Sequence, residues 1–221
     1  MRLVAVLALC SLAWPALAPA QAARPAAQRR PATPATKKVP AEVKCPATLG
    51  RGVDSQRVFC DVLTATSPED AVAVVVPPHQ GAATLTFDLH NRHTYSAEEE
   101  ASGRAYARYL ATIAVVTPAG EVLARASIMS DVRSVDDLLD RVPADDAPAE
   151  FKAVAPTGQE SIVVTVPADV TEVYLIGERL VVERLYGRDV FTAPGRPVAI
   201  VSGVGVEYRP APVRRAPPRK R

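Results

Sequence analysis

An alternating stretch in the middle of the chain, residues 104–129, constrains the fold most strongly. Beginning at Ala105, every second residue is apolar, and the positions between them include polar residues such as Thr112. This period of two is typical of a half-buried β-strand. The sequence Thr-Pro-Ala-Gly at residues 117–120 fits a type I turn with a bulge, and the alternation resumes at Val122. The stretch therefore predicts a long β-hairpin.

A helix is the alternative for the first part of this stretch. Residues 96–99 form a capping-box pattern, and apolar residues recur four apart from Ala97 to Ile113. We favour a strand from about Ala105 because the β-branched residues near its end disfavour a helix. In addition, Gly103 weakens the helical pattern and no C-cap precedes Pro118.

Strand signals also flank the hairpin. Before it, residues 71–76 form a continuous apolar run, and residues 83–90 alternate. One short helix is predicted after it, with Ser134 as N-cap. The later strand signals lie at 151–155, 161–166, 172–177, 179–186 and 198–208, with a tight turn expected at 177–178 and a bulge at Gly203 and Gly205. This rhythm predicts a mainly β protein, an antiparallel β-sandwich of jelly-roll or immunoglobulin-like type.

The two termini differ in composition from the middle of the chain. Residues 1–22 read as a secretory signal peptide, with a charged start, an apolar core and small residues before the cut. Residues 23–44 are a basic linker rich in proline and alanine, and residues 209–221 are a basic, proline-rich tail; both are predicted to be disordered. Residues 45–208 are the folded domain. We therefore expect an exported periplasmic or secreted protein whose mature chain has no transmembrane segment.

An exported location determines how the cysteines are interpreted. Cys10 leaves with the signal peptide, so Cys45 and Cys60 remain in the mature chain. Their spacing matches neither a redox nor a zinc motif, and outside the cytosol a disulfide is the expected state. Closing a loop of about 15 residues contributes roughly 3 kcal/mol in the chain-entropy model.

Charge is distributed unevenly along the chain. Residues 45–208 contain 13 Lys and Arg side chains against 23 Asp and Glu, whereas the linker and the tail are both strongly basic. The tail cations are candidates for salt-sensitive polyanion binding, although solvated charge runs are common in tails. They are Arg214, Arg215, Arg219, Lys220 and Arg221. No motif for specific nucleic-acid recognition is present.

Three polar residues near one predicted strand end suggest a metal site. Asp88 and His90 are two apart, so their side chains share a face, and His93 could reach back from a following turn. However, the cluster matches no established zinc spacing, and a strand end normally exposes polar residues. We predict no bound metal or cofactor. Asp88, His90 and His93 remain the residues on which an alternative function, a metal-dependent hydrolase, would depend.

The remaining motifs do not indicate catalysis. No nucleophile elbow or phosphate-binding loop occurs, so we predict a non-enzymatic protein. Sugar binding normally uses aromatic rings against apolar sugar faces. The platform candidates are Tyr95, Tyr106, Tyr109, Tyr174, Tyr186 and Tyr208. The sequence therefore predicts an exported binding or structural module of the bacterial envelope. Its ligand, a protein, glycan or polyanion, is undetermined, and polyanion tethering through the basic arms is a further alternative.

Overall fold

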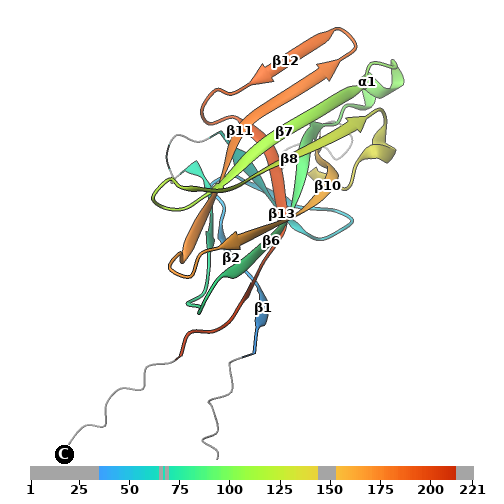
Figure 1. Cartoon of the computed structure of the whole chain (residues 1–221). Helices are drawn as coiled ribbons and strands as arrows, with labels where there is room; N and C mark the ends of the chain where they lie inside the picture. The colour runs from blue at the N-terminus through green and yellow to red at the C-terminus, as the bar shows by residue number, and fades with distance from the viewer. Residues whose placement is uncertain (1–34, 65–66, 68–69, 144–152, 213–221) are drawn as a thin grey trace, which may run out of the picture. The chain divides into compact units, whose positions relative to one another are not determined.

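The computed structural model describes residues 35–64, 67, 70–143 and 153–212. Its strands form two antiparallel sheets that face each other across a shared core, so the fold is a β-sandwich (Figure 1). The predicted signal peptide, residues 1–22, lies outside the described residues, as do the five tail cations.

Sheet A has seven strands and sheet B has six. In sheet A, β13 pairs with β4 and β1 along one edge and with β6 along the other, and β6, β10 and β9 follow in order. The strands of sheet A are β1 (Lys37–Pro40), β3 (Thr48–Arg51), β4 (Val58–Leu63), β6 (Ala83–Thr94), β9 (Val142–Pro143), β10 (Ala153–Val166) and β13 (Pro197–Tyr208).

In sheet B, β11 pairs with β5 and β12 along one edge and with β7 along the other. Two helical turns, α1 (Ala97–Ala101) and the 3-10 helix η2 (Val135–Asp137), follow β6 and β8. The strands of sheet B are β2 (Glu42–Lys44), β5 (Val72–Val75), β7 (Ala107–Val116), β8 (Val122–Val132), β11 (Glu172–Arg184) and β12 (Gly187–Phe191).

The pairing order identifies the sandwich as a jelly roll. The β7–β8 hairpin is the tip of a two-stranded ribbon whose successive pairs are β6 with β10, β5 with β11, and β4 with β13. These pairs alternate between the sheets, because β6–β10 and β4–β13 lie in sheet A while the other two lie in sheet B. A ribbon rolled in this way gives the eight-stranded, double Greek-key arrangement of a jelly roll. The predicted fold class is confirmed.

The predicted hairpin is present and is preceded by a short helix. Ser96 caps α1 by accepting a hydrogen bond from the backbone N–H of Glu99, and Gly103, at φ 66°, follows the helix. The chain then enters β7 at Ala107. The helix start at Ser96 and the alternating pattern are therefore both realised, one after the other, although only the Ser96 half of the capping box forms. The hairpin turn is closed by the N–H of Thr117 donating to the carbonyl of Glu121 at 2.8 Å.

Two local predictions differ from the structure. The tight turn expected at residues 177–178 is instead a bulge within β11. A Cβ on Gly177 would lie 2.3 Å from Cγ2 of Val198, so only glycine lets β11 approach sheet A here. The helix expected after Ser134 is only the 3-10 turn η2, although Ser134 does cap it. The bulge expected near Gly203 and Gly205 is present.

The folded region begins earlier and ends later than residues 45–208. Residues 37–44, assigned above to the linker, form β1 and β2. At the other terminus, the carbonyl of Arg209 accepts a hydrogen bond from Gln80, and the N–H of Ala211 donates to Pro78. Backbone pairing requires no alternating apolar pattern, which explains why composition did not indicate these segments.

The core fills the space between the sheets. The inward positions of β6 are Ala83, Leu85, Phe87 and Leu89, and they pack against Ile113, Leu175 and other side chains of sheet B. Further along β6, the inward positions become polar, at Asn91 and His93. A smaller cluster of Phe59, Val142 and Ile200 covers part of the outer face of sheet A.

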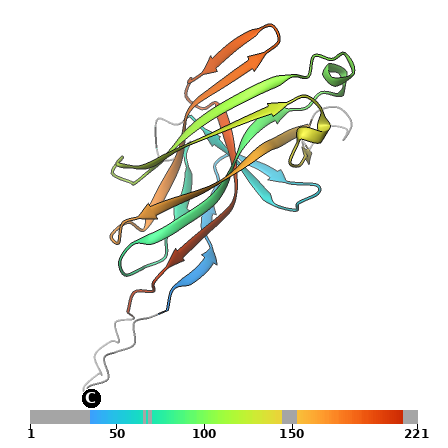
Figure 2. The same ribbon diagram turned by 45° about the vertical axis from the view of Figure 1, so that its right-hand side comes forward.

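Strand β6 also defines the two ends of the sandwich. Its first residues lie beside the end of β13, which pairs with β1, so β1 and the end of β13 lie together. Its last residues lead into α1, on the side where the β11–β12 hairpin lies (Figures 1 and 2). We call the first the tail end and the second the cleft end. None of the helices in the described part of the chain is long and apolar enough to cross a membrane.

Candidate functional site

A cleft of about 540 Å³ opens at the cleft end. One wall comes from sheet A, where β6 ends and β13 begins, and the other comes from β7, β11 and β12 of sheet B. Residues of α1 and of the segment that joins it to β7 complete the rim. A cavity of this size is in the range that holds a small ligand.

A histidine–tyrosine pair lies inside the cleft. Nδ1 of His93 and the hydroxyl of Tyr109 are 2.7 Å apart in a hydrogen bond, and the two rings meet edge to face. Burial lowers the pKa of His93 to about 4, and the positive charge of Arg184 acts in the same direction. Burial raises the pKa of Tyr109. Both side chains are therefore neutral near pH 7.

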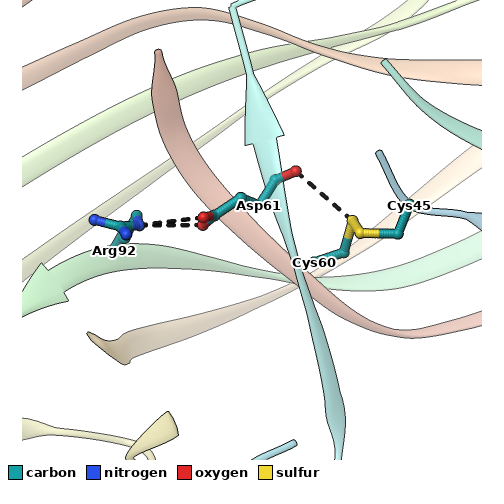
Figure 3. Close-up of a disulfide and its surroundings, with 4 residues drawn as sticks. All are labelled: Cys45, Cys60, Asp61 and Arg92. Carbon is teal, nitrogen blue, oxygen red and sulfur yellow. Dashed lines mark hydrogen bonds and ion pairs between the residues drawn. A yellow bond between two sulfur atoms is a disulfide. The ribbon is translucent and has the colours of Figure 1, made fainter. Parts of the chain in front are cut away.

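Arg92 reaches the cleft from the outer face of β6 and is held by a carboxylate of β4. Its Nε lies 3.2 Å from Oδ1 and 3.3 Å from Oδ2 of Asp61 (Figure 3). Burial raises the pKa of Asp61, which is only 7% exposed, and the ion pair with Arg92 offsets part of this rise. Because both contacts use Nε, the terminal Nη groups of Arg92 are not consumed by Asp61.

Three further arginines line the cleft, and they come from separate segments. The guanidinium of Arg196 lies over the ring of Phe191, 3.7 Å from its centroid. Arg184 pairs with the exposed carboxylate of Asp189 at 3.4 Å. Arg104 follows α1 and forms no ion pair with any other residue that the structure describes.

Aromatic and acidic side chains complete the lining. Tyr95 and Tyr106 line the cleft together with Glu98 and Glu99 of α1. The hydroxyl of Tyr95 donates to Oε2 of Glu100 at 2.7 Å, which fixes the ring. Three of the six predicted platform tyrosines therefore gather here. The other three, Tyr174, Tyr186 and Tyr208, do not line the cleft.

The structure does not bring the three candidate metal ligands together. Strand β6 continues to Thr94, so alternation places Asp88 and His90 on the outer face and His93 on the inner face. Asp88 instead accepts hydrogen bonds from Ser161 at 2.7 Å and from Arg57 at 3.2 Å. Within the described ranges, no group of three His, Cys, Asp or Glu side chains is arranged to hold a metal ion.

The other two histidines are buried and hydrogen-bonded. Nδ1 of His90 lies 2.8 Å from the carbonyl of Gly158, so Nδ1 carries the proton, and Nε2 accepts from the hydroxyl of Ser202. Burial lowers the pKa of His90, against the opposing effects of Gly158 and Asp88. At the tail end, His79 contacts the carbonyl oxygens of Pro77 and Pro167. Both rings join segments that are distant in sequence.

The predicted disulfide between Cys45 and Cys60 is present, with the two Cα atoms 6.0 Å apart. Cys45 lies in the segment that connects β2 of sheet B to β3 of sheet A, and Cys60 lies in the buried strand β4. The disulfide therefore attaches this connection to β4. Asp61 follows Cys60 directly, so the disulfide and the anchor of Arg92 are neighbours on one strand (Figure 3).

The four cleft arginines were missed by the sequence analysis. They are spread from position 92 to position 196, with no spacing that would mark a motif. They meet only because β6, β11 and β13 end or begin at the same end of the sandwich.

Comparisons with known proteins do not assign this chain to a family. No family model matches the sequence, and no curated protein matches it. The K1 cleaved adhesin domain of Lys-gingipain from Porphyromonas gingivalis W83 matches with TM-score 0.30 and 9% identity, over 82% of this chain and 94% of that one. The enzymatically active domain of bacteriophage CBA120 tailspike protein 4 matches with TM-score 0.21 and 11% identity, over 79% and 19%. These are weak similarities, and no function is drawn from them.

Proposed function

We propose that this chain is an exported, non-enzymatic binding module of the bacterial envelope and that its ligand occupies the cleft. The observation that carries the proposal is the composition of the cleft, where arginine, tyrosine and phenylalanine side chains surround about 540 Å³ of open space. Arginine and tyrosine, together with tryptophan, are enriched among the residues that dominate binding energy at protein–protein interfaces.

The state of the cleft side chains supports binding over catalysis. A histidine with a pKa of about 4 is a weak proton acceptor near neutrality, because a general base works best when its pKa is close to the working pH. Its Nδ1 is already bonded to Tyr109. Arg92, Arg184 and Arg196 are held by Asp61, Asp189 and Phe191. The contacts of Arg92 and Arg196 fix two groups of a recognition surface, whereas the ion pair of Arg184 is exposed to solvent.

Export is supported by the signal-like N-terminal sequence and by the disulfide, which persists in oxidising compartments. The expected test result is an exported protein whose mass corresponds to a cut after Ala20 or Ala22. Recovery of the intact chain in the cytoplasm, with reduced cysteines, would contradict this part of the proposal.

Blocking the cleft tests the binding function. Ala105 lines the cleft and is half-buried, so Ala105→Trp should fill it without disturbing the core. Ala119→Trp is the matched control, because Ala119 is exposed in the β7–β8 turn at the opposite end of β7. We expect the full exported chain to sediment with isolated cell-envelope fragments, and only Ala105→Trp to lose this retention. Equal retention of both variants would remove the proposal.

Polyanion tethering through the basic arms is a second candidate, and one observation favours it. Lys37 of β1 pairs with Tyr208 of β13, so the two basic segments attach to the domain side by side at the tail end. We expect deletion of residues 213–221 to weaken adsorption to anionic vesicles at low salt, because Arg214, Arg215, Arg219, Lys220 and Arg221 are removed. Unchanged adsorption would exclude the tail as the segment that binds anionic surfaces. The Ala105→Trp variant should adsorb normally.

A further inference from the structure

We propose that the ligand of the cleft is an anionic sugar, a saccharide unit that carries a carboxylate or a phosphate group. This inference rests on the proposed function and specifies the chemical class that the cleft recognises. Three observations carry it: the local charge, the way the arginines are held, and the combination of aromatic rings with carboxylates.

The cleft is less acidic than the domain as a whole. Residues 45–208 have an excess of ten acidic side chains. The cleft lining has a different balance, with Arg92, Arg104, Arg184 and Arg196 against Glu98 and Glu99. Asp61 and Asp189 pair with Arg92 and Arg184, whereas Arg104 and Arg196 form no ion pair with any other residue that the structure describes. A concave surface with walls of low dielectric concentrates the field of such a group. An anion is therefore repelled less at the cleft, where it can approach Arg104 and Arg196, than by most of the remaining domain.

Two of the four cleft arginines, Arg92 and Arg196, are positioned before any ligand arrives. Arg196 is stacked on Phe191, which covers one face of the guanidinium and leaves its N–H edges directed sideways. Arg92 is held through Nε alone, so both Nη groups remain for a ligand. A planar guanidinium with free N–H groups matches the oxygens of a carboxylate or phosphate. Fixing these side chains in advance reduces the entropy lost on binding.

The other lining residues indicate a sugar and disfavour a densely charged polymer. Tyr95 and Tyr106 line the cleft, and aromatic rings of this kind stack against the apolar faces of sugar rings. Glu98 and Glu99 can accept hydrogen bonds from hydroxyl groups, and they would repel a ligand with a negative charge at every position. A ligand with one anionic group and several hydroxyls satisfies both sets of residues.

The test measures the affinity of the full exported chain for defined ligands by calorimetry. The probes are digalacturonate, its neutral dimethyl ester and glucose 6-phosphate. The variants are Arg196→Gln and Arg104→Gln, which change exposed side chains of the cleft. The matched control is Arg125→Gln, because Arg125 lies on β8 and pairs with Glu178 outside the cleft.

We expect at least one charged probe to bind and the dimethyl ester to bind at least about tenfold more weakly. Each cleft substitution should weaken the charged probe by about tenfold to a hundredfold, the range for one charge-assisted hydrogen bond. Arg125→Gln should bind as the wild type does. Preference for digalacturonate assigns a carboxylate, and preference for glucose 6-phosphate assigns a phosphate.

The outcomes separate the inference from the proposed function. If digalacturonate binds and its ester binds equally well, or if neither cleft substitution weakens the charged probe that binds, the anionic-sugar assignment is overturned. If none of the three probes binds while Ala105→Trp still abolishes envelope retention, the cleft binds something else and only the ligand class is wrong. If Ala105→Trp retains envelope binding, the proposed function itself fails.

Discussion

The two ends of strand β6 are built by different kinds of contact. At the cleft end, side chains meet side chains: Arg92 with Asp61, His93 with Tyr109, and Arg196 with Phe191. At the tail end, the contacts between segments are made largely by the backbone, as between Gln80 and Arg209. Backbone contacts tolerate many sequences, whereas side-chain contacts depend on specific residues. Residue-specific function is therefore expected at the cleft end.

The largest expected difference between the ends is in their response to acid. Ordinary histidine takes up a proton near pH 6.5, but burial holds the folded-state pKa of His93 at about 4. The unfolded chain therefore binds this proton more tightly, so stability is full above about pH 6.5 and falls as the pH drops towards 4. A shift of this size corresponds to about 3 kcal/mol, and His90 acts in the same direction.

The measurement is urea unfolding at several pH values between neutral and acidic conditions. His93→Gln preserves a polar partner for Tyr109 and cannot take up a proton, so its stability should decline less steeply with acid. If His93 is responsible for the acid sensitivity, the free energy of unfolding must fall more steeply with decreasing pH in the wild type than in the variant. Identical slopes would assign the acid sensitivity to other groups.

The disulfide lies between the ends, and its removal should have the next largest effect. Cys45→Ala combined with Cys60→Ala opens a loop with a sequence separation of 15 residues. In the chain-entropy model this costs about 3 kcal/mol of stability. Thermal unfolding of the double variant should match that of the reduced wild type. A change well under 1 kcal/mol would mean that the crossing between the sheets is held by packing alone.

Asp61→Asn tests whether the anchor of Arg92 contributes to the cleft. It preserves shape but removes the carboxylate charge that faces Nε of Arg92. Hydrogen bonds to charged groups contribute about 1.5 to 3 kcal/mol, so we expect a loss of about 2 kcal/mol. Affinity for the charged probe should also fall, while that for the dimethyl ester should not. A loss of stability with unchanged ligand selectivity would make the role of Asp61 purely structural.

The smallest effect is expected at the tail end. The N–H of Ala41 donates to the carbonyl of Val204 at 3.0 Å, and Ala41→Pro removes that donor. Loss of one backbone hydrogen bond should cost about 1 kcal/mol. Ala41→Ser preserves the N–H and serves as the control. Ligand affinity at the cleft should be the same in all three proteins, and a change would show that the two ends are coupled.

The same contrast explains what could be predicted from the sequence. The β7–β8 hairpin and the disulfide were predicted because alternation and cysteine spacing are local signals. The alternation of side chains along a strand correctly predicted that Asp88 and His90 share one face of β6. It did not reveal that the strand continues to Thr94, which places His93 on the opposite face.

The cleft could not be predicted in the same way. Its arginines become neighbours through pairings between strands that are about a hundred residues apart, such as β6 with β13. Tyr95, Tyr106 and Tyr109 were candidates for a sugar platform, but nothing local distinguished them from Tyr174, Tyr186 or Tyr208. The strand β1 was missed because its sequence, KKVP, has the composition of a linker, and pairing with β13 uses backbone groups.

The rolled ribbon also determines when the domain can be completed. Strand β13 is the last to be synthesised, yet it lies in the middle of sheet A, between β4 and β6. Until it inserts, β4 has no link to β6, β1 has no partner in the sheet, and sheet A remains in three pieces. Contacts between strands so distant in sequence form slowly. Sheet A is therefore completed only after β13 has been synthesised, because β4 and β6 are joined through β13 alone.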